Sequence, residues 1–284
     1  MIAICGMSGL VGSKLEKMFS SHGEEVVALR VRDNTDVQEL ANTLEKCDTL
    51  INLSGTSILA RWSEPYKKSL YDSRINTTKK LVDAMSTCRD KPKLFISTSA
   101  VGIYASNKPQ NDDSTEYEND FLSTLCQDWE AEANRAKELG IRCLQTRFGV
   151  VYASEGGAMS KMLPPFKLGL GGKVGSGEQI VSWIHIDDLL RAIEFIIKTP
   201  AIEGSVNFTS PSPSSNLEQT KIIGKVLNRP TFFAVPSFVL KLIFGEGSSV
   251  ILDSKEVYPS KLLENGFVFN YEKFEDALED ILVL

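Results

Sequence analysis

Ile2-Ala3-Ile4-Cys5-Gly6-Met7-Ser8-Gly9-Leu10-Val11-Gly12 is the stretch that decides the fold. Four apolar residues predict a buried strand, a glycine-rich turn follows, and a helical period from Leu10 to Ser20 predicts a helix. Glycine is needed where a turn is tight, where the backbone approaches a pyrophosphate, and where strand and helix pack closely. The free N–H groups of the helix start then face the phosphates. The stretch therefore predicts a phosphate-binding βα unit, with G-x-x-G-x-x-G spacing in place of G-x-G-x-x-G.

The same alternation of strand and helix continues through the first half of the chain. Short runs that are apolar on both faces predict the strands of a buried parallel sheet: Ile2 to Cys5, Val26 to Leu29, Thr49 to Asn52, Leu94 to Ser97 and Cys143 to Thr146. Segments of helical period lie between them: Leu10 to Ser20, Val37 to Glu45, Glu64 to Ser86 and Asp120 to Leu139. This order predicts an α/β protein with a Rossmann-type, doubly wound parallel sheet.

The composition changes after about residue 150. Glycine and proline gather in 156–177, serine and proline in 210–215, and apolar helical runs recur at 189–197, 217–227 and 238–244. We expect residues 1–155, completed by parts of 178–210, to form the dinucleotide-binding domain. Residues 156–284 then form mainly a smaller substrate and C-terminal domain that closes a cleft. The glycine-rich segment 169–177 is typical of a lid over the cofactor.

Composition limits the class of protein and its partners. The chain has 284 residues, of which 42% are hydrophobic and 24% charged, as in a soluble globular protein. A net charge of −6 argues against nucleic-acid and anionic-membrane partners, so we expect a small-molecule substrate and leave the oligomeric state open. Five cysteines without a C-x-x-C pair exclude a zinc ribbon and favour a reducing compartment. We predict no metal site. Without a basic leader or about 18 consecutive apolar residues, we expect a cytoplasmic protein.

The end of the second predicted strand bears on the choice of cofactor. Arg30, 21 residues beyond Gly9, and Arg32 stand where NAD-preferring enzymes usually carry a carboxylate. An arginine there accommodates the 2′-phosphate of NADP, so we predict NADP over NAD. Asp33 falls past the expected strand end. The alternative is that both arginines are ordinary solvated surface residues.

Over nearly its whole length the sequence resembles the extended short-chain dehydrogenases/reductases, and more closely their atypical "epimerase family" branch with its own C-terminal domain. The motifs that carry the resemblance are the glycine turn, Asn52-Leu53-Ser54-Gly55, Phe95 to Ala100, Arg61-Trp62-Ser63-Glu64, Asp72-Ser73-Arg74-Ile75, Gly157 to Phe166, Ser182 to Asp188, Leu227 to Pro230 and Asn265-Gly266-Phe267. Together with the residues above, the resemblance implies a cofactor site of Gly6, Ser8, Gly9, Leu10, Val11, Gly12, Arg30, Arg32, Leu53, Ser54 and Gly55.

The usual catalytic groups of short-chain reductases are incomplete in this sequence. In them a lysine lowers the pKa of a tyrosine four residues earlier, and a serine orients the carbonyl. Ser99 matches the serine, but Cys126 stands about where the tyrosine belongs and Glu130 about where the lysine belongs. Cys126 is alternatively a small packed hydrophobe. The literal Tyr104-x-x-x-Lys108 lies in a loop, so we treat its spacing as chance and Tyr104 as a substrate-side candidate.

The resemblance also places Arg61, Trp62 and His185 on the substrate side. Asp187 or Asp188 is expected to cap a helix beginning at Leu189. The sequence as a whole predicts an NADP-dependent oxidoreductase, or a nucleotide-sugar-epimerase-like enzyme, acting on an unidentified small carbonyl or hydroxyl compound. The alternative is a cofactor-sensing or structural protein with a degenerate site, linked to cell division by a name that relatives carry. If the protein is an enzyme, its proton moves through Ser99, Tyr104, a water or the substrate.

Overall fold

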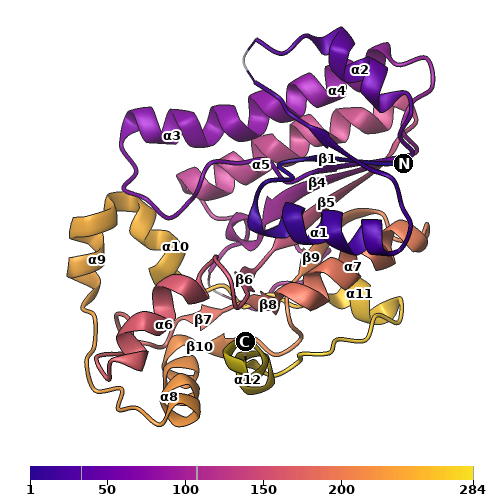
Figure 1. Ribbon diagram of the computed structural model, residues 1–284. Helices are drawn as coiled ribbons and strands as arrows, with labels where there is room; N and C mark the ends of the chain where they lie inside the picture. The colour runs from indigo at the N-terminus through magenta and orange to yellow at the C-terminus, as the bar shows by residue number, and fades with distance from the viewer. Residues whose placement is uncertain (33, 107, 284) are drawn as a thin grey trace.

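A six-stranded parallel sheet forms the centre of the computed structural model, which describes residues 1–32, 34–106 and 108–283 (Figure 1). The strand order is β2-β1-β3-β4-β5-β9, and every neighbouring pair is parallel. The strands are β1 (Ile2–Cys5), β2 (Val26–Leu29), β3 (Thr49–Asn52), β4 (Leu94–Ala100), β5 (Arg142–Phe148) and β9 (Gly204–Phe208). The predicted Rossmann-type α/β fold is confirmed. β4 and β5 are longer than predicted, and β9 was not among the predicted strands.

Helices cover both faces of this sheet (Figure 1). One face packs against α1 (Leu10–Ser21) and α7 (Ile186–Lys198), and the other against α2 (Val37–Leu44), α4 (Thr77–Thr87) and α5 (Phe121–Asn134). Successive residues of a strand point to opposite faces. Ile2 and Ile4 of β1 accordingly join the core under α1 and α7, whereas Ala3 and Cys5 join the core under the other three helices.

The helix predicted over residues 64–86 has an irregular turn in its middle. It runs as α3 (Glu64–Tyr71), a π-helical turn η1 (Asp72–Asn76) and then α4. A single π turn inside an α-helix admits one extra residue and re-aims the side chains around it, and such turns are frequent at functional sites. Arg74 lies in the middle of this turn.

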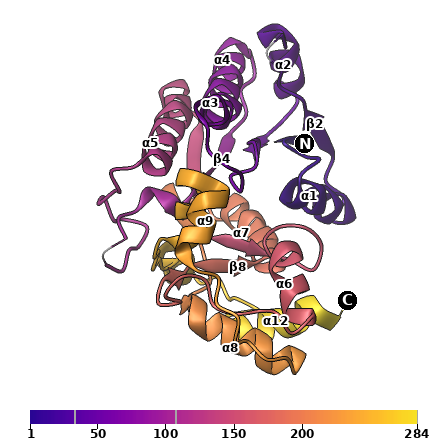
Figure 2. The same ribbon diagram turned by 90° about the vertical axis from the view of Figure 1, so that its left-hand side faces the viewer.

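Residues after β5 build the remaining part of the molecule, whose helices α6, α8 and α12 gather beyond α7 (Figure 2). Tyr152, Trp183 and Phe274 stack together at the centre of its core. Two small sheets contribute, the pair β6 (Val150–Tyr152) and β8 (Trp183–His185) and the pair β7 (Ile180–Val181) and β10 (Ser214–Ser215). The helices are α6 (Met159–Lys167), α8 (Asn216–Leu227), α9 (Ser237–Phe244), α10 (Ser249–Leu252), α11 (Ser260–Glu264) and α12 (Phe274–Val283), and short 3-10 turns are η2 (Val101–Ile103), η3 (Arg135–Leu139) and η4 (Gly245–Ser248).

The strand order sets the place where a ligand can bind. The chain leaves β1 toward β2 on one side and returns to β3 on the other, so β1 and β3 flank the switch point of the sheet. In open α/β sheets ligands bind in the crevice outside the carboxyl ends of the strands at such a point. None of the described helices is long and apolar enough to cross a bilayer.

Candidate functional site

The glycine turn at the carboxyl end of β1 is packed so tightly that side chains are excluded. Gly6 has a φ of +83°, and a Cβ there would lie 2.8 Å from the Leu53 carbonyl carbon. A Cβ on Gly12 would lie 2.5 Å from the Gly6 carbonyl oxygen. Gly9 caps α1 without a side-chain hydrogen bond, and the first turn of α1 carries no acidic residue. The helix start therefore presents its free N–H groups and positive end to the crevice, as a pyrophosphate requires.

The loop after β3 packs against the glycine turn. The Leu53 amide donates to the Cys5 carbonyl over 2.8 Å, which joins the loop to the end of β1. The Ser54 hydroxyl donates to Asn52 Oδ1 over 2.5 Å. The segments that the sequence assigned to the cofactor are thus brought together by the fold.

Arg30 and Arg32 follow directly after β2, and both are exposed. Neither forms an ion pair with another residue in the described part of the chain. Asp33, which the sequence analysis weighed against them, lies outside the described residues. Exposed guanidinium groups at this position can accommodate a 2′-phosphate, so the residues around the turn fit a dinucleotide cofactor.

Glu130, at the place of the missing lysine, belongs to a buried ion pair. Arg147 of β5 binds Glu130 of α5 with two parallel hydrogen bonds of 2.7 Å, from Nε to Oε1 and from Nη2 to Oε2. The Ser99 hydroxyl at the end of β4 donates to the same Oε1 over 2.6 Å. Ser99, Glu130 and Arg147 are all buried. The carboxylate that replaces the lysine is therefore neutralised inside the protein.

Tyr104 extends the same network. Its hydroxyl accepts from Arg147 Nη1 over 2.6 Å and donates to Asn207 Oδ1 over 2.8 Å. The ring is fully buried, and burial raises the pKa of Tyr104 to about 12. Lys108 pairs with Glu116 instead, in keeping with the interpretation of the Tyr-x-x-x-Lys spacing as chance. Both hydroxyl groups that the sequence nominated for proton transfer are engaged with protein partners.

The sequence analysis missed Arg147 and Asn207. Arg147 follows Cys143 to Thr146, a run predicted to be a buried strand, and a cation at the end of such a run signals a buried partner. Asn207 lies in the unpredicted strand β9, and no local pattern points to it. Cys126 packs beside Val101 and Ile103, and burial raises the pKa of its thiol to about 12, which fits the packed-hydrophobe alternative.

The substrate-side candidates Arg61 and Trp62 connect the loop after β3 to α9. Trp62 is buried, donates its indole N–H to the Ile58 carbonyl over 3.0 Å, and packs edge-on against Phe121. Arg61 Nη1 donates to the Leu242 carbonyl over 2.9 Å. The exposed Arg61 can still meet a ligand, whereas Trp62 acts as core.

His185 caps α7, which corrects the prediction for this helix. The helix begins at Ile186, three residues before the predicted Leu189, and His185 Nδ1 accepts the Asp187 backbone N–H over 3.3 Å. Neither Asp187 nor Asp188 is the cap. Asp188 is buried and accepts the backbone N–H groups of Asn270 and Tyr271 instead, so it holds the C-terminal segment.

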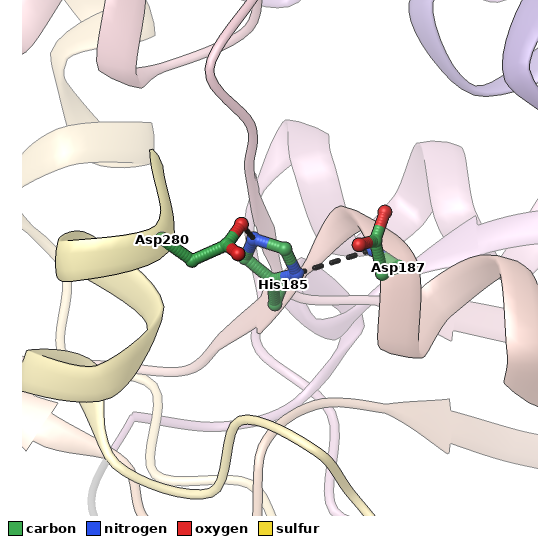
Figure 3. Close-up of side chains that lie close together, drawn as sticks. All are labelled: His185, Asp187 and Asp280. Carbon is green, nitrogen blue, oxygen red and sulfur yellow. Dashed lines mark hydrogen bonds and ion pairs between the residues drawn. The ribbon is translucent and has the colours of Figure 1, made fainter. Parts of the chain in front are cut away.

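His185, Asp187 and Asp280 lie close together (Figure 3). Because Nδ1 accepts a backbone N–H, we assign the ring proton to Nε2, which lies 3.4 Å from Asp280 Oδ2. A metal ion at Nε2 would have to displace this proton. The cluster therefore joins α7 to α12, with the Tyr271 ring packed on the imidazole at a centroid distance of 3.9 Å.

The cap predicts a pH dependence of stability. Burial lowers the pKa of His185 below its ordinary 6.5, although Asp187 and Asp280 oppose this shift. The unfolded chain therefore takes up a proton at a higher pH than the folded one, and stability falls as the pH drops below about 6.5. His185→Asn keeps a capping side chain but does not titrate. Urea unfolding at pH 7.5 and pH 5.5 should show a larger loss for the wild type than for His185→Asn, and equal losses would contradict this assignment.

The segment expected to form a lid lies elsewhere. Residues 169–177 run alongside 230–237, with bridges from Gly172 to Phe232 and from Val174 to Val235. The segment that approaches the start of α1 is the one at Gly156 and Gly157, where an added Cβ would meet the Leu10 side chain. The predicted lid over the cofactor is thus wrong, because the segment is packed against 230–237, most closely at Gly172.

The fold, the glycine turn and the switch-point crevice define a dinucleotide-binding protein of the short-chain dehydrogenase/reductase kind. The chain belongs to the NAD dependent epimerase/dehydratase family, which matches residues 2–207, and residues 235–281 match a domain of unknown function, DUF1731. This confirms the resemblance seen in the sequence.

Several relatives match almost the whole chain. Epimerase family protein YfhF of Bacillus subtilis is 34% identical over 99% of this chain and 97% of its own length. The SDR39U1 homolog of Arabidopsis thaliana, described as chloroplastic, is 35% identical over 95% of this chain and 77% of its own. The crystal structure of human epimerase family protein SDR39U1 with NADPH superposes with a TM-score of 0.89 at 32% identity, covering 99% of this chain and 98% of that one.

Proposed function

We propose that this protein binds NADP(H) in the crevice between β1 and β3 and uses it in redox chemistry on a small carbonyl or hydroxyl compound. The observation that carries the proposal is the glycine turn packed against Leu53, with the exposed Arg30 and Arg32 directly after β2. The human relative whose structure holds NADPH supports it.

Each part of the crevice has a separate task in this proposal. The Gly6 to Gly12 turn and the start of α1 hold the pyrophosphate through backbone N–H groups. Arg30 and Arg32 hold the 2′-phosphate through charge-assisted hydrogen bonds. The bound nicotinamide supplies or accepts the hydride. The protein fixes the distance and orientation of the reacting groups, which by itself can lower the barrier by several kcal/mol.

Proton transfer differs from that of ordinary short-chain reductases. A phenol of ordinary pKa near 10 becomes a useful base only when a cation lowers that value. Tyr104 has a raised pKa, and Glu130 carries the opposite charge to the missing lysine. The proton of the reaction is therefore exchanged with a bound water or with the substrate's own groups. The Ser99 hydroxyl does not supply it, because it donates its hydrogen bond to Glu130.

A second candidate function is cofactor sensing without turnover. The enclosure of Ser99 and Tyr104 in the Glu130–Arg147 network favours it, because both hydroxyl groups already have protein partners. NADPH oxidation measured against a panel of ketones and nucleotide sugars separates the two functions. Turnover of any member supports the enzyme, and saturable NADPH binding with no turnover supports the sensor.

The choice of cofactor gives a direct prediction. Replacing Arg30 and Arg32 together by alanine should weaken NADPH binding by about tenfold to a hundredfold, since charged hydrogen bonds contribute about 1.5–3 kcal/mol. NADH lacks the 2′-phosphate and should bind wild type and variant alike. Isothermal titration of both cofactors measures the effect. A wild type without preference for NADPH, or a double variant that retains it, would remove Arg30 and Arg32 from the site.

A further inference from the structure

Arg74, in the π turn between α3 and α4, carries a cation that no carboxylate in the described part of the chain balances. Its Nη1 donates to the Leu70 carbonyl over 3.2 Å and its Nη2 to the Thr56 carbonyl over 3.0 Å. The remaining N–H groups of the guanidinium have no hydrogen-bond acceptor among the described residues. The residue is only partly exposed, and burial lowers the pKa of its side chain. A charge held in this way is stabilised by the arrival of an anion.

Two other arginines show how this chain satisfies a guanidinium for structural purposes. Arg147 binds Glu130 with two parallel hydrogen bonds. Arg142 donates to the carbonyls of Ile196, Thr199 and Ile202 near the end of α7, where a positive charge is favourable. Arg74 also donates to backbone carbonyls, but to only two of them, and it has no carboxylate partner among the described residues, so most of its guanidinium N–H groups are left for an anion.

The guanidinium lies at the edge of the cofactor crevice. It is set flat against Gly55, where an added Cβ would come within 3.0 Å of Arg74 Cζ. Gly55 follows Leu53, the residue that contacts Gly6 of the phosphate turn. On its other side the guanidinium lies 5.3 Å from the centre of the Trp129 ring, and Trp129 precedes Glu130 on α5.

Arg74 offers a positive charge that α5 lacks. The resemblance places a lysine where Glu130 stands, and here Glu130 binds Arg147 instead. We propose that Arg74 binds the nicotinamide-ribose phosphate half of NADP(H), supplying from the π turn the cation that α5 lacks. The inference rests on the proposed function. The planar fork of arginine suits a phosphate or a pair of ribose hydroxyls.

Two ligands locate the contact on the cofactor. NADPH contains both halves, whereas adenosine 2′,5′-bisphosphate contains the adenine half with its 2′-phosphate and lacks the nicotinamide ribose phosphate. Arg74→Gln keeps hydrogen-bonding groups and removes the charge, so it should weaken NADPH binding about tenfold or more and leave the bisphosphate affinity unchanged. Arg74→Lys keeps a charge without the fork and should lose less NADPH affinity than Arg74→Gln, again with no change for the bisphosphate.

Arg142→Gln is the matched control, because it makes the same chemical change at the first residue of β5, at the opposite end of the strands from the crevice, and should alter neither affinity. Circular dichroism establishes that each variant is folded, and if Arg74→Gln is not, the Arg74→Lys titration against the wild type decides. Unchanged NADPH affinity, or an equal loss for both ligands, overturns the assignment of Arg74. A wild type that binds neither ligand overturns the proposed function itself, so the two failures are distinguishable.

Discussion

Glu130→Ala is expected to lower the free energy of unfolding by about 3–5 kcal/mol, the usual loss when one partner of a buried ion pair is removed. The variant leaves the Arg147 guanidinium, whose side chain is only 3% exposed, without its carboxylate. It also leaves the buried Ser99 hydroxyl without the acceptor at 2.6 Å. Chemical denaturation followed by circular dichroism measures the loss.

Glu132→Ala is the control for this prediction. Glu132 lies on the same helix and pairs with Arg135, whose side chain is 43% exposed, so its loss should change stability by less than about 1 kcal/mol. A second control is the double variant Glu130→Ala/Arg147→Met, which removes both charges and should recover part of the stability. Equal losses for Glu130→Ala and Glu132→Ala would show that the buried pair contributes no more than a surface pair.

The buried pair explains how the helix that carries catalytic groups in related reductases can do without them. Glu130 and Arg147 join α5 to β5, and Tyr104 and Asn207 extend the connection to the loop after β4 and to β9. A lysine at position 130 would place two cations side by side in the core. The buried carboxylate at 130 therefore depends on Arg147, which neutralises its charge.

The parts of the structure set by local sequence were predictable. The first three strands have the predicted bounds, since short runs that are apolar on both faces fit only a buried sheet. The glycine turn was also predictable, because its backbone conformation and its close packing both require glycine. Contacts between distant segments were not. Tyr104 and Asn207 are 103 residues apart, and nothing near either residue indicates the other.

The wrong predictions involve positions where the local sequence allows two interpretations. Asp187 or Asp188 was expected to cap the helix, because aspartate is the commoner N-cap. The backbone instead enters the helix three residues earlier, which makes the His185 imidazole the acceptor. The glycines of 169–177 resembled a flexible lid, but an added Cβ on Gly172 would lie 1.7 Å from the Phe233 carbonyl oxygen. Glycine there permits packing, and sequence alone does not separate that role from flexibility.

Gly12→Ala is expected to distort the glycine turn from Gly6 to Gly12. Inside a helix alanine is normally favoured over glycine by about 1 kcal/mol. Here the added Cβ would lie 2.5 Å from the Gly6 carbonyl oxygen and 2.7 Å from Met7 Cα. Both are backbone atoms, which no side-chain rotation can move. The clash therefore outweighs the propensity, and the variant should lose about 1–3 kcal/mol of stability.

The effect on the cofactor should exceed what that loss of stability alone produces. Relief of the clash moves the start of α1 away from the Gly6 turn, which separates the N–H groups that the pyrophosphate needs together, so NADPH affinity should fall at least about tenfold. Gly140→Ala supplies the comparison, because Gly140 has a φ of +76° and no atom within 4 Å of an added Cβ. Its strain should lower stability by about 1–2 kcal/mol without touching the crevice. If Gly140→Ala weakens NADPH binding as much as Gly12→Ala does, cofactor binding follows overall stability and the turn has no special part in it.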